Sequence, residues 1–282
     1  MEKLQSALNK ARERRQASGT GAATPPNHPS RAPAAKSGGL TSSADKLWDE
    51  LPTFKPSQKE LDENRVVTYK AGSAATSFDI LRTKVLLQMR QNNWSRIAIT
   101  SPTPRCGKTT TACNLGIGLS RHADIRSILF DLDLRRPAVG KYLGHYPQTG
   151  IRQLLQGKVP FSEQAVRFRS NMALCAARSP IVDPTSLLLS ETASKVFDDI
   201  QVAYQPNLML FDLPPFLVSD DTRAFLKNVD CVLILVRAGE TTVSQIDTCE
   251  KEISEHTNVM GVVLNQCQYV TDDTYGYSYE SY

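Results

Sequence analysis

The sequence predicts an α/β fold, a doubly wound and mostly parallel sheet, on two observations. Short apolar runs recur along the chain, each bounded by polar or turn residues, and the stretches between them read as helices. Continuous apolar strands that alternate with helices are typical of a parallel sheet covered on both faces. The runs are RIAIT (96–100), RSILFD (126–131), NLMLFD (207–212), CVLILV (231–236) and MGVVLN (260–265).

Two elements are expected before the first of these runs. The segment RVVTYK (65–70) reads as a short strand. The segment ATSFDILRTKVLLQMRQ (75–91) reads as a helix, because its apolar residues recur at helical spacing. The apolar face of that helix holds Phe78, Leu81, Val85 and Leu86.

The two ends of the chain differ in composition from the middle. Residues 1–16 have apolar residues at helical spacing among basic ones, which predicts a basic amphipathic helix. It is either a short surface helix or a docking helix for a partner or an anionic membrane surface. Residues 17–48 are rich in Pro, Ser, Gly and Ala and predict a flexible linker. The main domain is expected over 49–268, followed by a tyrosine-rich tail, 269–282.

Composition and charge exclude several classes of protein. The chain of 282 residues is 40% hydrophobic and 22% charged, which suffices for a sizeable core. A net charge of +4 is too slight to argue for nucleic acid, and no nucleic-acid partner is expected. No apolar run approaches the roughly 20 residues that span a bilayer, and the start of the chain does not read as a secretory signal. The six cysteines lack CxxC pairing and metal-ligand spacing, so a reduced, cytoplasmic protein is expected.

The first apolar run is followed by a phosphate-binding sequence, SPTPRCGKTTTACNLGIGLS (101–120). Gly107, Lys108 and Thr109 at a strand-to-helix turn are the functional end of a P-loop, where backbone N–H groups and the helix dipole hold phosphate. Pro102 stands where the standard spacing has glycine. The residues expected to bind ATP are Thr103, Pro104, Arg105, Cys106, Gly107, Lys108, Thr109 and Thr110.

Carboxylates end two of the predicted strands. ILFDLDLRRP places Asp131 and Asp133 at the end of one strand, and LMLFDLPP places Asp212 at the end of another. Alternate residues of a strand point the same way, so the first two can face one site at the carboxyl end of the sheet. A single strand-ending Asp is more often a helix cap or turn residue. Three beside a GKT sequence are better explained by Mg²⁺ bound to phosphate.

Taken together, GKTT, DLDLRRP and FDLPP resemble the three nucleotide-binding motifs of the bacterial tyrosine kinases of capsular and exopolysaccharide synthesis. The resemblance runs from about Phe78 to the end of the chain. It includes TGIRQLLQGK, DPTSLLLSETASKVFDDI, VLILVRAGETTVSQI and NVMGVVLNQ. It implies a P-loop NTPase of the deviant Walker type that uses ATP and Mg²⁺ as a stand-alone cytoplasmic kinase.

The resemblance also implies roles for individual residues. Lys108 would bind phosphate, and Thr109 with Asp212 would hold Mg²⁺. Asp131 and Asp133 would accept the tyrosine proton, and Asp131 would complete the metal site. A carboxylate is suited to this work, because a phenol with an ordinary pKa near 10 needs a base as phosphoryl transfer proceeds.

Four further positions are compared with the family. Asn265, at the end of the last predicted strand, is expected either to read adenine or to be a strand-end turn residue. The family's oligomerisation helix carries a Glu and two Arg spaced three apart, where this chain has Thr76, Asp79 and Arg82. Only Arg82 is kept, so this motif does not predict a closed ring.

The tail carries the acceptors that the resemblance implies. Autophosphorylation is expected in trans on tyrosines that follow the last strand, to regulate polymerisation and export of polysaccharide. The implied partners are a membrane-anchored polysaccharide co-polymerase that acts as activator, a second copy of the chain, and a protein-tyrosine phosphatase. The resemblance also implies that the co-polymerase holds the protein at the inner face of the plasma membrane. The alternatives are an ATP switch of the positioning or partition type and an ATP-binding regulator without kinase activity. The expected acceptors are Tyr269, Tyr275, Tyr277, Tyr279 and Tyr282.

Overall fold

The computed structural model describes residues 43–267, and these form the doubly wound α/β domain that the apolar runs predict. Seven strands make one sheet in the order β3-β4-β2-β5-β1-β6-β7. Every neighbouring pair is parallel except β3 with β4. The strands are β1 (Arg96–Thr100), β2 (Ser127–Asp131), β3 (Val166–Phe168), β4 (Met172–Cys175), β5 (Leu208–Asp212), β6 (Cys231–Arg237) and β7 (Asn258–Asn265).

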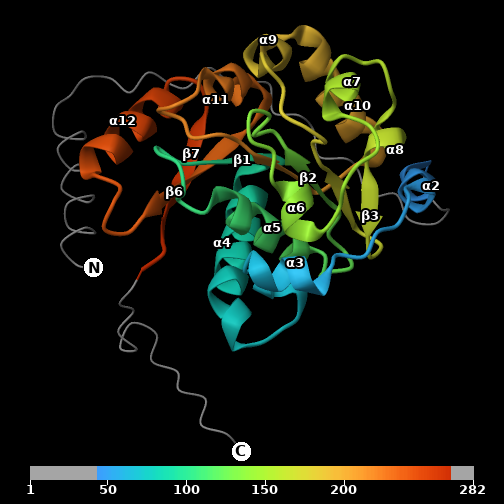
Figure 1. Ribbon diagram of the computed structural model, residues 1–282, viewed down its shortest axis with the longest axis horizontal. Coiled ribbons are helices and arrows are strands. Elements are labelled where there is room, and N and C mark those ends of the chain that lie inside the picture. The colour runs from blue at the N-terminus through green and yellow to red at the C-terminus, as the bar shows by residue number, and fades with distance from the viewer. Residues whose placement is uncertain (1–42, 268–282) are drawn as a thin grey trace, which may run out of the picture. The chain divides into compact units, whose positions relative to one another are not determined.

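Helices cover both faces of this sheet (Figure 1). The two faces build separate hydrophobic clusters, as expected for strands that are apolar on both sides. One face packs against α3 (Gln58–Glu63), α4 (Thr76–Asn92), α5 (Lys108–Leu119) and α6 (Val139–Leu143). The other packs against α2 (Ser43–Glu50), α7 (Ile151–Leu155), α8 (Phe161–Gln164), α9 (Pro184–Leu189), α10 (Glu191–Tyr204), α11 (Asp220–Phe225) and α12 (Val243–Ser254).

The central strands show why their sequences are apolar without interruption. Leu129 and Leu210 point to one cluster, and Phe130 and Phe211 point to the other. The rings of Phe130 and Phe211 stack at 5.1 Å, and Phe197 of α10 meets each of them edge-on at 5.3 Å. Alternation within a strand therefore selects a face rather than separating core from solvent.

The predicted strands and the predicted helix over 75–91 are confirmed, and two strands were missed. β1, β2, β5, β6 and β7 coincide with the five apolar runs to within two residues, and 75–91 corresponds to α4. β3 and β4 have three and four residues, and β3 pairs in the antiparallel sense at the edge of the sheet. Strands this short carry too little periodicity to be told from a loop.

The prediction of a strand over residues 65–70 is wrong. Val67–Tyr69 form a short 3₁₀ helix instead. The reason is tertiary: the buried Asn114 of α5 accepts hydrogen bonds from the backbone N–H groups of Val67 at 2.9 Å and Thr68 at 3.1 Å. Its amide nitrogen donates to the carbonyl of Arg65 at 2.9 Å. These bonds satisfy backbone groups that a neighbouring strand would otherwise have to satisfy.

The predicted linker over 17–48 extends too far. Its last residues form helix α2 (Ser43–Glu50), so the folded domain begins no later than Ser43. Trp48 is fully buried, and its indole N–H donates to the carbonyl of Tyr204 in α10 at 2.7 Å. Asp45 of the same helix forms an ion pair with Arg126. An isolated eight-residue helix is marginal, so this packing is what holds it. Within residues 43–267 no helix combines the length and apolarity needed to cross a bilayer.

Candidate nucleotide and metal site

The predicted P-loop connects β1 to α5 at the carboxyl edge of the sheet. Helix α5 begins at Lys108 and carries no acidic residue in its first turn. Gly107 precedes it in the left-handed backbone region, with φ of 86°. The first N–H groups of a helix have no partner within the helix, so this end is suited to hold phosphate. The loop and first turn contain all eight predicted ATP-binding residues from Thr103 to Thr110.

The end of β7 holds the P-loop from the side. The Asn265 amide nitrogen donates to the carbonyl of Cys106 at 2.9 Å, and the Gln266 amide nitrogen donates to the carbonyl of Arg105 at 2.9 Å. A Cβ atom on Gly107 would overlap the Asn265 amide nitrogen, so the contact requires glycine there. The Asn265 oxygen accepts from the N–H of Gln266. These contacts favour the strand-end alternative for Asn265, and its contact with adenine stays a prediction.

Arg105 adopts a backbone conformation that is uncommon for arginine. Its φ is 64°, in the left-handed region that favours glycine. The bond from Gln266 to its carbonyl helps to hold this conformation. Cys106 is buried beneath the loop, where its thiol donates to the carbonyl of Thr103 at 3.2 Å. These two non-glycine residues are therefore accommodated within the loop.

The two strand-end carboxylates of β2 and β5 are direct neighbours. Asp131 and Asp212 pair in register across the parallel strands, and both are fully buried. The Thr109 hydroxyl donates to Oδ2 of Asp212 at 2.6 Å. Oδ2 of Asp131 accepts from the N–H groups of Ala138 at 3.1 Å and Val139 at 3.0 Å. The Oδ1 atom of each carboxylate is buried without a hydrogen-bond partner.

Burial disfavours the charged forms of both groups. It raises the pKa of Asp212 to about 7, although the Lys108 ammonium and the Thr109 hydroxyl act in the opposite direction. Burial also raises the pKa of Asp131 well above its ordinary range, and the Asp212 carboxylate raises it further. Two adjacent buried carboxylates need cationic partners to be ionised together. Lys108, whose residue is 7% exposed, supplies one positive charge.

The residues present fit a magnesium ion. Mg²⁺ takes oxygen ligands, and it is usually held by one or two carboxylates together with substrate phosphates and water. The unpartnered Oδ1 atoms of Asp131 and Asp212 and the Thr109 hydroxyl beside them are donors of this kind. Within the described part of the chain, no group of three or more His, Cys, Asp or Glu residues forms a complete metal cage.

Asp133 lies at the same edge in a different environment. It is partly buried, and its Oδ1 accepts from the N–H of Arg136 at 3.3 Å. Burial raises its pKa, and the Lys108 ammonium opposes that effect. A raised pKa makes a carboxylate a stronger base, which suits the predicted role as proton acceptor.

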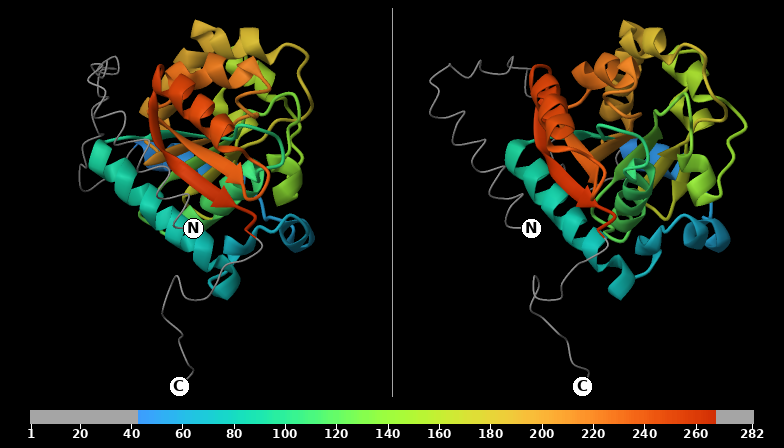
Figure 2. Two further views of the ribbon diagram at one scale, coloured as in Figure 1. Left: turned by 90° about the vertical axis from the view of Figure 1, so that its left-hand side faces the viewer. Right: turned by 60° about the vertical axis from the view of Figure 1, so that its left-hand side comes forward.

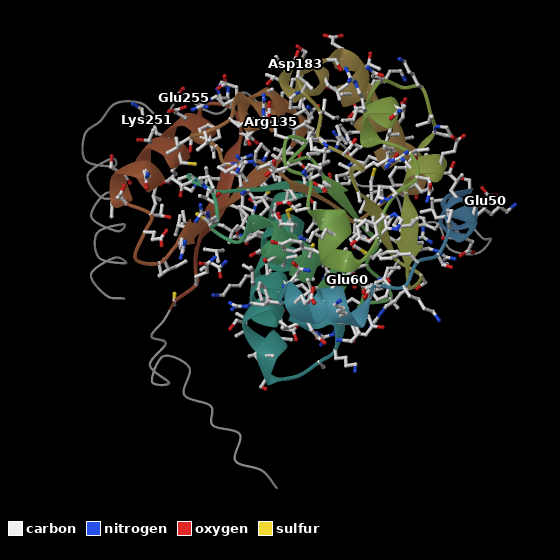
Figure 3. All side chains as sticks on the ribbon, viewed as in Figure 1. Glu50, Glu60, Arg135, Asp183, Lys251 and Glu255 are labelled. Carbon is white, nitrogen blue, oxygen red and sulfur yellow. The ribbon has the colours of Figure 1, made fainter. Side chains whose placement is uncertain are left out.

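Sequence reasoning missed an ion pair that connects the loop after β2 to helices α9 and α11 beside the site. Arg135 donates to Asp221 at 2.7 and 3.1 Å, and the Thr185 hydroxyl donates to the same carboxylate at 2.5 Å. Burial alone would raise the pKa of Asp221, but the hydrogen bonds from Arg135 and Thr185 bring it below its ordinary value. Figure 3 labels Arg135 near α11, together with Asp183, which precedes α9. The arginine in DLDLRRP was a visible signal, but its partner is 86 residues away in sequence.

Two of the three residues at the family's oligomerisation positions, Asp79 and Arg82, are engaged within this chain. Asp79 accepts from Arg82 at 2.6 Å and from Arg121 at 2.8 Å. Arg82 is only 8% exposed and also donates to the carbonyl of Gly118 at 3.4 Å. Arg82 therefore packs α4 against α5 and is not available on the surface. The five predicted acceptor tyrosines and the predicted basic helix, 1–16, lie outside the described residues.

Curated proteins of related sequence are tyrosine kinases from bacteria. The chain is 29% identical over 205 residues to the putative tyrosine-protein kinase EpsB of Ralstonia nicotianae, an alignment that covers 71% of this chain and 26% of EpsB. It is 26% identical over 200 residues to the tyrosine-protein kinase YwqD of Bacillus subtilis, covering 70% of this chain and 83% of YwqD. The chain is thus similar in sequence to bacterial tyrosine-protein kinases. It spans about a quarter of the length of EpsB but most of YwqD.

Solved structures agree on the fold. The kinase domain of the Escherichia coli tyrosine kinase ETK matches with a TM-score of 0.64 at 22% identity, over 74% of this chain and 82% of that domain. Cobyrinic acid a,c-diamide synthase from Mycobacterium smegmatis, solved with bound ADP and magnesium, matches with a TM-score of 0.50 at 19% identity over 60% of this chain and 73% of that one. No family model matches the chain. The fold of this chain is thus shared by a tyrosine-kinase domain and by a synthase solved with bound ADP and magnesium.

Proposed function

We propose that this chain is an ATP-dependent protein-tyrosine kinase domain of exopolysaccharide or capsule synthesis. The observation that carries the proposal is the pair of buried carboxylates, Asp131 and Asp212, each with an unpartnered oxygen beside the P-loop residues Lys108 and Thr109. Such a pair is costly in a protein that binds no cation there. The relatives named as tyrosine kinases support the choice of reaction.

Each residue of the site has a definite part in this reaction. The N–H groups at the start of α5 bind the phosphates, and Lys108 neutralises charge as the γ-phosphoryl group transfers. Thr109 and Asp212, already hydrogen-bonded to each other, would hold Mg²⁺ together with Asp131. When bound, Mg²⁺ would supply positive charge that stabilises the negative charge developing on the transferring phosphoryl group.

Asp133 is the proposed proton acceptor. It lies two residues beyond Asp131, within the electrostatic influence of Lys108, and is partly exposed where Asp131 is fully buried. An accessible carboxylate with a raised pKa can orient the acceptor phenol and take its proton as the phosphoryl group transfers. Asp131, whose Oδ2 accepts two backbone N–H groups, is better suited to the metal than to proton transfer.

The proposed acceptors are the tail tyrosines of a neighbouring copy, and the proposed role is control of polysaccharide polymerisation and export. Each phosphate adds about −1.5 to −2 charge, so modification at several positions would make the tail strongly anionic. We further propose a membrane-anchored co-polymerase as activator, a phosphatase as the opposing enzyme, and location at the inner membrane face through the activator.

The experiment uses the full chain with ATP and Mg²⁺, with and without the membrane activator. We expect phosphate on peptides from 269–282, detected by intact mass and peptide mapping. Lys108→Met should lose nucleotide binding and transfer, whereas Asp133→Asn should keep binding and lose transfer. Asp124→Asn is the matched control, because Asp124 is an exposed carboxylate before the start of β2, whereas the site lies at the carboxyl ends of the strands.

Two outcomes separate the alternatives. Phosphate on the tail of Lys108→Met protein, after it is mixed with active protein shortened to 1–267, would support transfer in trans. Bound nucleotide without any phosphate on the tail, in the presence of the activator, would contradict the kinase and support an ATP-controlled regulatory switch.

A further inference from the structure

The carboxyl end of β7 holds two consecutive peptide groups of the P-loop. Figure 2 shows β7 at the near edge of the sheet, between α12 and α4, and the strand ends at Asn265. The Asn265 amide donates to the carbonyl of Cys106 at 2.9 Å, and the Gln266 amide donates to the carbonyl of Arg105 at 2.9 Å. The second bond joins residues that are 161 positions apart. The conformation of the P-loop therefore depends on side chains from a distant part of the sequence.

Each of these bonds also fixes the direction of the N–H group in the same peptide unit. The C=O and N–H of a trans peptide lie in one plane and point in opposite directions, and the described residues contain no cis peptide bond. Because Gln266 holds the Arg105 carbonyl, the N–H of Cys106 points away from the end of β7. Asn265 orients the N–H of Gly107 in the same way. Successive N–H groups that point to one side form an anion-binding concavity.

The bond from Gln266 has a particular importance because of the backbone at Arg105. The φ of Arg105 is 64°, in the left-handed region, which a residue with a Cβ atom adopts only at a cost in free energy. Glycine would adopt it without that cost. If the bond were lost, Arg105 would favour other backbone conformations. Such a change would rotate the peptide group that carries the N–H of Cys106.

We propose that Gln266 is a positioning residue for nucleotide phosphate, because its bond to the Arg105 carbonyl holds the P-loop in the phosphate-binding conformation before nucleotide binds. The inference rests on the proposed function and adds to the site a residue that lies outside its three motifs. Gln266 acts through the loop and does not itself contact phosphate. A loop that is ordered in advance loses less conformational freedom on binding, so its affinity for the ligand is higher.

Gln266 is a better position for a test than Asn265. Gln266 is exposed, so its bond to the loop can be removed without disturbing either hydrophobic cluster. Asn265 lies so close to Gly107 that a Cβ atom on the glycine would overlap its amide nitrogen. A substitution of Asn265 would therefore change the packing of the loop as well as a hydrogen bond.

The experiment titrates the full chain with ATP and Mg²⁺ in a calorimeter and compares Gln266→Met with the wild type. Methionine has nearly the length of glutamine and donates no hydrogen bond. We expect ATP binding to be weaker by about three- to tenfold, which corresponds to the loss of one hydrogen bond. Gln91→Met is the matched control and should bind ATP as the wild type does. Gln91 is exposed near the end of α4, before β1 begins, whereas the P-loop follows β1.

Inorganic tripolyphosphate tests whether Gln266 acts through the phosphate-binding loop. This probe contains neither adenine nor ribose. A residue that orders the loop should therefore change the binding of tripolyphosphate and of ATP by the same factor. A residue that contacts the nucleoside should change the binding of ATP alone. An unchanged affinity of Gln266→Met for tripolyphosphate, measured by competition with a fluorescent ATP analogue, would overturn the proposal.

Arg105→Gly provides a rescue that a merely structural role of Gln266 would not predict. Glycine adopts the left-handed conformation without the help of Gln266, so Gln266→Met should weaken ATP binding by less than about twofold in Arg105→Gly protein. Equal losses in the two backgrounds would contradict the proposal. Thermal unfolding of each variant checks that it is folded. Normal ATP binding by Gln266→Met would remove only this inference, whereas a wild type that binds neither ATP nor tripolyphosphate would remove the proposed function with it.

Discussion

Asp212→Asn should stabilise the nucleotide-free protein, although it removes a residue of the proposed site. Asp212 is fully buried, its Oδ1 atom has no partner, and burial raises its pKa to about 7. The folded protein therefore holds this proton to a higher pH than the unfolded chain, where the pKa is 3.8. By linkage, the free energy of unfolding then falls as pH rises from about 4 to about 7. Asparagine has nearly the same shape and carries no charge, so the free energy of unfolding of Asp212→Asn does not fall in this way as the pH rises.

The size of the effect follows from the same values. Above pH 7 the Asp212 carboxylate is charged in both the folded and the unfolded state. The difference between its pKa values in the two states, about 7 and 3.8, corresponds to at most about 4 kcal/mol of unfolding free energy, at about 1.4 kcal/mol for each pKa unit. For a domain of this size that is a rise in Tm of up to about 10 °C at pH 8. At pH 4 the two proteins should differ little, because the carboxylate is then protonated when folded.

Thermal unfolding of the wild type, Asp212→Asn and the control Asp124→Asn between pH 4 and pH 8 measures this effect. Added Mg²⁺ and ATP should stabilise the wild type at pH 8 but not Asp212→Asn, because the ligand needs the ionised carboxylate. The reasoning is refuted if Asp212→Asn is no more stable than the wild type at pH 8, or if the difference between them does not grow with pH. The carboxylate would then be a structural residue without electrostatic cost.

Three other substitutions test single contacts. Arg135→Ala should lower the free energy of unfolding by about 2 kcal/mol in chemical denaturation, because it leaves the buried Asp221 carboxylate without its cation. The control is Arg136→Ala at an exposed position, which should change the free energy of unfolding by less than about 0.5 kcal/mol. Equal effects of the two substitutions would contradict the role of the ion pair. Gly107→Ala should weaken ATP binding in calorimetry by at least tenfold, because a Cβ atom there overlaps the Asn265 amide and φ is 86°; unchanged affinity would show that the loop adapts. Trp48→Ala should cost about 3–5 kcal/mol of stability, since its indole is fully buried against α10; a negligible loss would restore the linker prediction for residues 43–48.

Local pattern was sufficient where an element is long or carries a short-range motif. The five apolar runs predict β1, β2, β5, β6 and β7, because a strand buried on both faces must be apolar throughout. The GKT sequence predicts the strand-to-helix turn and the start of α5 at Lys108, because phosphate binding needs backbone N–H groups at that point. Local pattern failed over residues 65–70, where β-branched residues favour a strand but Asn114 supplies other hydrogen-bond partners.

The sequence by itself determined the fold class, the P-loop and the acidic residues that end β2 and β5, because each depends on residues close together in the chain. Tertiary structure alone decided that Asp131 and Asp212 are adjacent and share one buried environment, that Arg135 pairs with Asp221, and that Arg82 lies inside the domain. It also decided that β7 ends the sheet formed by the described residues, since the order of strands in a sheet is not written in any one of them. The physical reason is common to these cases: pKa values, ion pairs and free edges depend on contacts between segments far apart in sequence, which periodicity does not encode.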